Sequence, residues 1–291
     1  MRLSRVSEAG VRVLALHGKG GSASSMARTL EPLVKATESY GWRWTFATAP
    51  HEICASNTQG GSKAITFTAG SAWWTLPPGV RSFEAESFEG IDESMKVLEL
   101  CWKENGPFDC LLGHSQGAML TAVLVAKAME VESKSLLKPK CAIISGAAWP
   151  NPYGDLITAV ASKDSSIPTL HCWGIEDTVN PPEMAQKLKG CFAASKELEH
   201  DGGHIVPVDV DSIERMICFV NEAVSAALLT DDGNLSEVEE EREWGISYLG
   251  GDPCSSNHNT DPFDEQDSKP DAWEDMKKRI QAIVDRDRDG G

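Results

Sequence analysis

Short runs of apolar residues alternate along this chain with longer segments in which apolar residues recur every three or four positions. The runs have the length of buried strands, and the longer segments have the period of helices packed along one face. Strands that alternate with helices build a largely parallel sheet covered on both faces. The pattern therefore predicts an α/β fold, doubly wound around a mostly parallel sheet with helices on both faces. The expected strands are 11–16, 42–47, 110–112, 141–145, 169–173 and 196–199, and the expected helices are 22–36, 91–102 and 117–130.

The same pattern divides the chain into two parts. Residues 1–229 contain the alternating elements, and we expect them to form a single domain. Within it, residues 53–90 are rich in Gly, Ser, Thr and Pro, lack a clear period and exceed the length of an ordinary connection. We expect this excursion to form a lid or a pocket wall.

Residues 230–291 have a different composition, acidic and poor in apolar side chains, which is typical of a largely flexible extension. Near its end, four apolar residues share one helical stripe, which predicts a short helix over 271–286. This helix is expected either to dock back on its own domain or to bind a protein partner. The stripe consists of Trp273, Met276, Ile280 and Val284.

The formal net charge of the 291 residues is −17. From residue 231 onward there are 18 acidic against 7 basic residues, so that most of the excess belongs to the extension. Nucleic acids are bound mainly through Lys and Arg on phosphate groups. The composition therefore excludes nucleic acid as the expected ligand.

The hydrophobic content of 41% is enough to build a core, but no apolar stretch reaches the roughly 18 to 20 residues of a membrane span. The first ten residues also lack the apolar segment of a secretory signal. Eight cysteines are scattered without CxxC pairs, and several lie in apolar runs where a thiol behaves as a small core residue. We therefore expect a cytoplasmic protein with reduced cysteines.

The segment Gly113-His114-Ser115-Gln116-Gly117 stands between an expected strand and an expected helix. This is the context of the Gly-x-Ser-x-Gly nucleophile elbow, in which a sharp turn exposes the serine. The flanking glycines are needed because side chains at 113 and 117 would collide with neighbouring backbone. Ser115 is therefore the candidate nucleophile.

A serine nucleophile needs a base and an acid, which follow it in the order Asp and then His in proteins with this elbow. Asp177 comes just after the apolar run at 169–173, and His204 follows the next weak run. His204 is the candidate general base, and Asp177 is the candidate acid that orients its ring. Glu176 is the alternative acid, whereas Asp201 is too close in sequence to His204.

The negative oxygen that forms during attack by a serine needs at least two donors. One is expected from the backbone N–H of Gln116, at the start of the helix after the elbow. The second is expected from the loop His17-Gly18-Lys19, most directly from the Lys19 N–H. This glycine-rich loop matches neither the P-loop nor the GxGxxG spacing, so nucleotide binding is a weak alternative.

Two further sets of side chains were considered for the site. Trp73 and Trp74 are adjacent in the 53–90 excursion, so that one is expected in the core while the other lines a substrate pocket. His200 and His204 have the spacing of a helical zinc site, but Gly202 and Gly203 between them disfavour a helix. We expect no metal and no cofactor.

The longer segment Gly106-Pro107-Phe108-Asp109-Cys110-Leu111-Leu112 together with the elbow and Ala118 resembles the signature of the FSH family of serine hydrolases. Leu16-His17-Gly18, Ala72-Trp73-Trp74 and Gly202-Gly203-His204-Ile205-Val206-Pro207 are similar to other parts of that family. The resemblance covers about residues 10–225. Here His114 stands where the family usually has Phe, which bears on the pocket, and Cys110 replaces a Gly.

The resemblance implies an α/β-hydrolase catalytic domain over 1–229 that acts on esters or acyl thioesters, often with apolar acyl chains, without a cofactor. The expected substrate is a small acyl ester or thioester. The alternative is a ligand receptor or interaction protein that keeps the hydrolase fold with little turnover, and the acidic extension would then be its docking segment. A peptidase is a third option, with no sequence feature in its favour.

Overall fold

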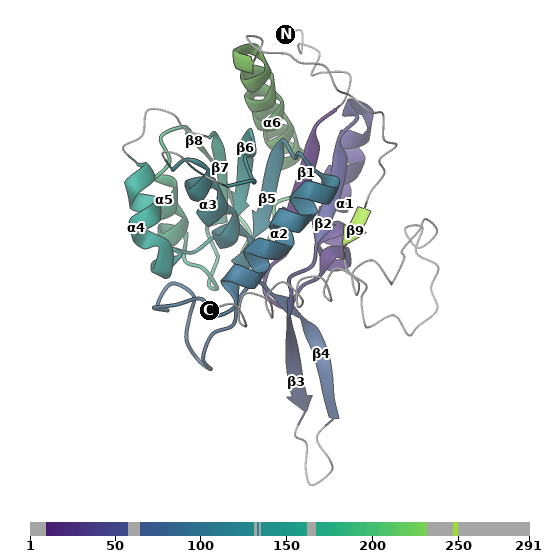
Figure 1. Cartoon of the computed structure of the whole chain (residues 1–291). Helices are drawn as coiled ribbons and strands as arrows, with labels where there is room; N and C mark the ends of the chain where they lie inside the picture. Colours follow the sequence, from purple (N-terminus) through teal and green to yellow (C-terminus); the bar gives the residue numbers. More distant parts are fainter. Residues whose placement is uncertain are drawn as a thin grey trace, which may run out of the picture.

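The computed structural model describes residues 10–57, 65–130, 133, 135–161, 167–231 and 247–249. Its centre is a seven-stranded sheet in the order β8-β7-β6-β5-β1-β2-β9, in which every neighbouring pair is parallel. The predicted mostly parallel sheet is confirmed (Figure 1). The strands of the sheet are β1 (Arg12–Leu16), β2 (Arg43–Ala47), β5 (Cys110–His114), β6 (Cys141–Ser145), β7 (Thr169–Gly174), β8 (Ser195–His200) and β9 (Ser247–Leu249).

Helices cover both faces of this sheet because alternate side chains of each strand enter two separate hydrophobic clusters. Leu14 and Leu16 of β1 lie in one cluster, whereas Val13 and Ala15 lie in the other. The first cluster contains side chains of α2 (Ile91–Asn105), α3 (Gln116–Ala128), α4 (Gly154–Val160) and α5 (Pro182–Lys189). The second contains side chains of α1 (Ala23–Thr37) and α6 (Val210–Asp231), and two short 3₁₀ turns lie at Glu38–Tyr40 and Asn151–Tyr153.

The excursion expected over 53–90 contains an antiparallel hairpin that the sequence pattern did not predict. Its strands, β3 (His51–Asn57) and β4 (Ile65–Ala72), point away from the central sheet in Figure 1. At its base, Ser71 accepts a hydrogen bond from the Gly20 amide (2.8 Å) and donates one to the Gly21 carbonyl (2.9 Å). The hairpin is therefore fastened to the glycine-rich loop after β1.

Part of the acidic extension belongs to the sheet. β9 pairs with β2 in parallel, with Thr45 opposite Ser247 and Ala47 opposite Leu249. The helix expected over 271–286 lies outside the described residues. In the described part of the chain, no helix has the length and hydropathy needed to cross a membrane.

The carboxyl ends of β1, β5, β6 and β7 reach the same edge of the sheet because these strands are parallel and in register. Ligand sites in open α/β sheets lie at this edge. The elbow and the other candidate residues follow these strands in the chain, so the topology brings them to one place.

Candidate active site

Ser115 lies in a sharp turn between β5 and α3 with φ 55° and ψ −116°, and it is the only described non-glycine residue with positive φ. A Cβ on Gly113 would lie 2.4 Å from the Gly117 carbonyl oxygen, and one on Gly117 would lie 2.5 Å from the Leu16 carbonyl oxygen. Neither position has room for a side chain. The prediction that side chains at 113 and 117 would collide with neighbouring backbone is therefore confirmed.

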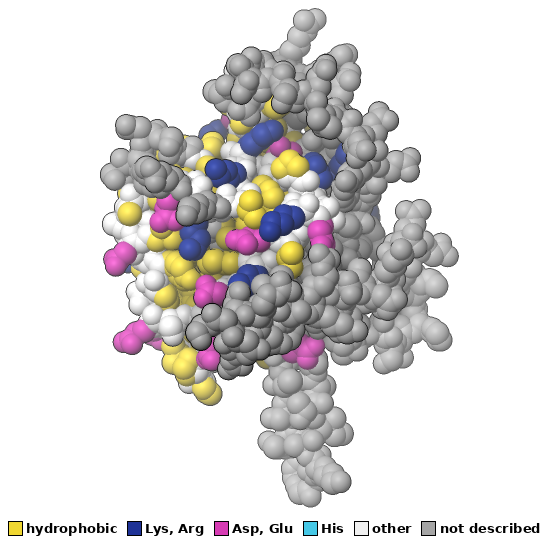
Figure 2. All heavy atoms as spheres, in the orientation of Figure 1, with side chains coloured by type: hydrophobic (Ala, Val, Ile, Leu, Met, Phe, Trp, Pro, Cys, Tyr) yellow, Lys and Arg dark blue, Asp and Glu magenta, His cyan; other side chains and the backbone are white. Residues whose placement is uncertain are grey.

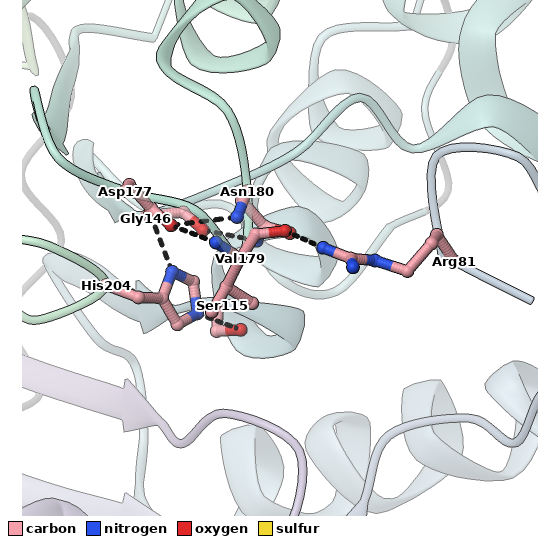
Figure 3. A network of polar contacts seen from close by, with 7 residues as sticks. All are labelled: Arg81, Ser115, Gly146, Asp177, Val179, Asn180 and His204. Carbon is pink, nitrogen blue, oxygen red and sulfur yellow. Dashed lines mark hydrogen bonds and ion pairs between the residues drawn. The ribbon is translucent and has the colours of Figure 1, made fainter. Parts of the chain in front are cut away.

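The structure brings Ser115, His204 and Asp177 into hydrogen-bond contact (Figure 3). Nε2 of His204 lies 2.8 Å from Oγ of Ser115, and Nδ1 lies 2.7 Å from Oδ2 of Asp177. A carboxylate can only accept, so Nδ1 carries the proton and Nε2 is left to accept from the serine hydroxyl. Glu176, the alternative acid, is exposed, whereas Asp177 is buried.

The Asp177 carboxylate is held by the loop that follows it. Its Oδ1 accepts hydrogen bonds from the backbone amides of Val179 (2.9 Å) and Asn180 (2.8 Å), while Oδ2 faces His204. The Asn180 side chain in turn donates to the Gly146 carbonyl at 2.7 Å. These bonds fix the direction of the carboxylate, and no local sequence signal marked Asn180.

A second link to this loop comes from the 53–90 excursion. Nη2 of Arg81 donates to the Val179 carbonyl, as Figure 3 shows. The same guanidinium lies 5.4 Å from the centroid of the Phe83 ring. Arg81 is 98 residues from Val179 in the sequence, so only the fold relates them.

The loop of Gly18 and Lys19 lies against Ser115, where a donor loop was expected. A Cβ on Gly18 would lie 3.1 Å from Cβ of Ser115. Within the described chain, the backbone amides of Lys19 and Gln116 donate to no protein acceptor. Both amides are therefore available to an oxygen bound beside Ser115, and Gln116 also stands at the N-terminus of α3, where the helix dipole favours negative charge.

His17 holds the Gly18-Lys19 loop in this position. Its Nδ1 lies 2.7 Å from the Gly18 carbonyl oxygen, and its Nε2 accepts a hydrogen bond from the Ala49 amide at 3.0 Å. Since the carbonyl must be an acceptor, Nδ1 carries the proton and the ring is neutral. The His17 carbonyl accepts a bond from the Trp73 indole at 2.8 Å.

Trp73 and Trp74 do not have the predicted pocket role. Both side chains are 0% exposed, and neither lines the cavity beside Ser115. Trp73 is fixed by its bond to His17, and Trp74 stacks on Phe88 with ring centroids 4.1 Å apart. The prediction placed one of the two indoles in the core and the other in the pocket. It is wrong because α2 and the irregular residues before it cover both side chains.

The Gln116 side chain connects these two tryptophans to the elbow. Its Oε1 accepts from the Trp73 amide (2.8 Å), and its Nε2 donates to the Trp74 carbonyl (2.9 Å). Gln116 is 4% exposed and therefore shielded from water. Its side-chain amide takes the place of water as the hydrogen-bond partner of the Trp73 amide and the Trp74 carbonyl. From the sequence, a role was expected only for the backbone amide of Gln116.

His114 does line the cavity, and its ring lies 4.9 Å from that of His204. Burial, followed by the proximity of His204, lowers the pKa of His114 to about 4. His114 Nδ1 is buried and has no hydrogen-bond partner among the residues that the structure describes. The ring is therefore neutral near pH 7.

A cavity of about 270 Å3 adjoins Ser115 and runs from the His17–Gly21 loop to the first turns of α1. Met26 is the one aliphatic side chain that lines it, beside Ser25 and Thr29 of the same helix. Within the described residues, no group of three or more His, Cys, Asp or Glu side chains has the arrangement of a metal site. His200, whose spacing from His204 was weighed against a zinc site, accepts a hydrogen bond from the Gly202 amide.

The fold has solved counterparts among α/β hydrolases. The structure of the esterase PE8 superposes with a TM-score of 0.54 at 20% identity, covering 76% of this chain and 95% of that one. An acyl-protein thioesterase 2 from Zea mays gives a TM-score of 0.53 at 16% identity, with coverages of 76% and 96%. At these identities the likeness defines the class of fold: a parallel α/β sheet of the hydrolase type.

Residues 6–216 match the family model described as "Serine hydrolase (FSH1)". The chain is 30% identical to Esterase CG5412 of Drosophila melanogaster over 79% of its length and 81% of that protein. It is 30% identical to Esterase OVCA2 of Danio rerio over 68% of its length and 90% of that protein. The chain therefore belongs to the FSH family of serine hydrolases and is an enzyme of that class.

Proposed function

We propose that Ser115, His204 and Asp177 form a catalytic triad that cleaves carboxylic esters or acyl thioesters through an acyl-enzyme. The observation that carries this proposal is the continuous pair of hydrogen bonds, 2.8 Å from Ser115 to His204 and 2.7 Å from His204 to Asp177. A hydroxyl needs such a base because an unassisted serine is almost never ionised near neutral pH. The names of the relatives, esterases in two animals, agree with this reaction.

In the first half of the reaction, Oγ of Ser115 attacks the substrate carbonyl while Nε2 of His204 takes its proton. The carbonyl oxygen becomes negative and is stabilised by the free amides of Gln116 and Lys19, with Gly18 allowing close approach. His204 then gives its proton to the departing alcohol or thiol. Asp177 stabilises the transient imidazolium and keeps its Nδ1–H in place.

In the second half, water attacks the acyl-enzyme and His204 acts again as the base. The tetrahedral intermediate collapses to the free acid, and the proton returns to Oγ of Ser115. The buried bonds of Asp177 to the Val179 and Asn180 amides keep the acid fixed through both halves.

We assign a short acyl group to the cavity beside Ser115. An apolar acyl chain was expected from the family, but Met26 is the only aliphatic side chain available to it there. A long chain would have to continue outside this volume of about 270 Å3. The excursion over 53–90 would serve as a wall, since Ser71 is bonded to the loop after β1 and Arg81 to the loop after Asp177.

A fluorophosphonate probe tests the nucleophile directly. Wild-type protein should be labelled, and folded Ser115→Ala should not, while Ser145→Ala should be labelled as before. Parallel series of p-nitrophenyl esters and acyl-CoA thioesters then separate oxygen ester from thioester. Folded wild-type protein that resists the probe and hydrolyses neither series would refute the proposal.

A further inference from the structure

None of the described residues that line the cavity beside Ser115 is acidic, although the chain as a whole carries a net charge of −17. Its charged candidates are Lys19 and three histidines. On the face drawn in Figure 2, the visible basic and acidic side chains are interspersed over the surface. The charge of the cavity therefore depends on its own lining residues.

The histidines contribute no fixed positive charge. Both ring nitrogens of His17 are used as in the neutral form, with Nδ1 donating to Gly18 and Nε2 accepting from Ala49. Burial keeps the pKa of His114 at about 4. Both ring nitrogens of His204 are engaged, Nε2 by the Ser115 hydroxyl and Nδ1 by Asp177, so neither is available to an anion. Among the described residues of this lining, Lys19 is thus the one side chain that offers a positive charge to a ligand.

The Lys19 ammonium is free to bind a ligand. The side chain is exposed, and it forms no ion pair or hydrogen bond with any other described residue. The carboxylate of Asp177, the acid bound to His204, is 1% exposed and is engaged by the Val179 and Asn180 amides and by His204. Lys19 is therefore not neutralised from within the site.

The hydroxyl groups of α1 at the other end of the cavity are not available to bind an anionic ligand. Ser22 caps the helix by accepting from the Ser25 amide, and the Ser25 hydroxyl returns a bond to the Ser22 carbonyl at 3.0 Å. The Thr29 hydroxyl donates to the Ser25 carbonyl at 3.1 Å. These donors are used by their own helix, which leaves Lys19 as the strong anchor for an anion.

We propose that the substrate carries a carboxylate or another anionic group a few bonds from the ester or thioester carbonyl, and that the Lys19 side chain binds it. The proposal rests on the proposed function, because it places the carbonyl at Ser115. The Lys19 amide faces the carbonyl oxygen while its four-carbon stem carries the ammonium away along the cavity. Hydrolysis of such a compound consumes one water and yields a free acid and an alcohol or thiol, with the anionic group unchanged.

The test compares p-nitrophenyl hydrogen glutarate, whose acyl group ends in a carboxylate, with its methyl ester, which has the same chain without the charge. A second pair places the charge on the leaving group: 4-acetoxybenzoate against methyl 4-acetoxybenzoate. In at least one pair, the wild-type kcat/KM should favour the anion. The pair that does so identifies the side of the ester that lies beside Lys19.

Lys19→Met retains the backbone amide and the length of the stem but removes the charge. We expect it to reduce the anion-to-neutral ratio of kcat/KM by about tenfold, which is typical of a lost charged hydrogen bond. Lys19→Arg should restore most of the ratio. Lys103→Met is the matched control: Lys103 is exposed and lies near Asn105, whose carbonyl is bonded to Arg12 at the opposite end of β1, and it should leave the ratio unchanged.

Added salt should lower the wild-type ratio and have little effect on that of Lys19→Met, since ions screen an exposed charge pair. If wild type hydrolyses the neutral esters at least as well as the anions, and Lys19→Met does not change the ratio, this inference is wrong while the proposed function stands. If wild type cleaves no ester and is not labelled by a fluorophosphonate, the proposed function itself has failed.

Discussion

The side chain of Asn180 donates a 2.7 Å hydrogen bond to the carbonyl of Gly146. Gly146 directly follows β6 and has φ 63°, and a Cβ there would lie 3.3 Å from Cε1 of His204. The backbone amide of Asn180 also binds the Asp177 carboxylate. Asn180 thus ties the Asp177 loop to the backbone beside His204.

Asn180→Ala should therefore lower kcat more than it raises KM. Losing the bond to Gly146 lets the Asp177 loop move, and a small displacement of a catalytic group costs up to about 100-fold. Steady-state kinetics with a p-nitrophenyl ester measure the split. Asn105→Ala, at the far end of α2, is the control and should retain full activity; equal kinetics of the two variants would contradict the positioning role.

The neighbouring acids Asp177 and Glu176 offer a matched pair of variants. Asp177→Asn should lower kcat by about 10⁴-fold, because an amide no longer stabilises the required tautomer and the imidazolium. Glu176→Gln removes the same charge from an exposed side chain and should change kcat less than about twofold. The reverse order of effects would show that Glu176 is the acid.

His114→Phe should make the protein less sensitive to acid. The pKa of His114 is about 4 in the folded protein against 6.5 ordinarily, so between these values the unfolded chain binds a proton that the folded chain does not. Stability present above pH 6.5 is therefore lost as the pH falls toward 4. His171 behaves in the same way, with a pKa lowered by burial to about 3.

Urea unfolding at pH 7 and at pH 5 measures this effect. The slope contributed by one histidine is at most about 1.4 kcal/mol per pH unit. The variant should therefore lose less stability than wild type between the two pH values. A pH dependence as steep as in wild type would mean that His114 is not kept neutral by the fold.

Gln116→Leu removes the side-chain amide but keeps the backbone amide, and it should destabilise the protein. It leaves the Trp73 amide and the Trp74 carbonyl buried without partners, at a cost of about 1 to 3 kcal/mol each. Thermal unfolding should show a clear decrease in Tm. Gln186→Leu, on an exposed position of α5, should change the Tm little; similar Tm values for both variants would contradict the bridging role.

The parallel sheet and the order of Ser115, Asp177 and His204 were predictable because each depends on local signals. An apolar run, a turn glycine and a following helix are all visible within about ten residues. The roles of Asn180 and Arg81 were not predictable, since their partners Gly146 and Val179 lie 34 and 98 residues away. Only the folded chain brings these groups together.

The reading of Trp73 and Trp74 failed for a related reason. Local alternation assigns opposite faces to adjacent side chains, but it does not say whether both faces are covered. The β3–β4 hairpin was missed because the excursion around it is rich in Gly, Ser, Thr and Pro, although β4 itself begins with the strand-favouring residues Ile65, Thr66 and Phe67. β9 is only three residues long and lies in an acidic segment, so its apolar pattern is too short to predict a strand.

The pairing of β9 with β2 has a consequence for any shortened form of this protein. An open edge strand presents unpaired N–H and C=O groups, which are a template for joining another chain. With Ser247–Leu249 in place, the β2 edge is occupied by the protein's own backbone. Cutting the chain after residue 230 would therefore remove β9 together with the acidic segment. The β2 edge would then be open to pairing with another copy of the chain.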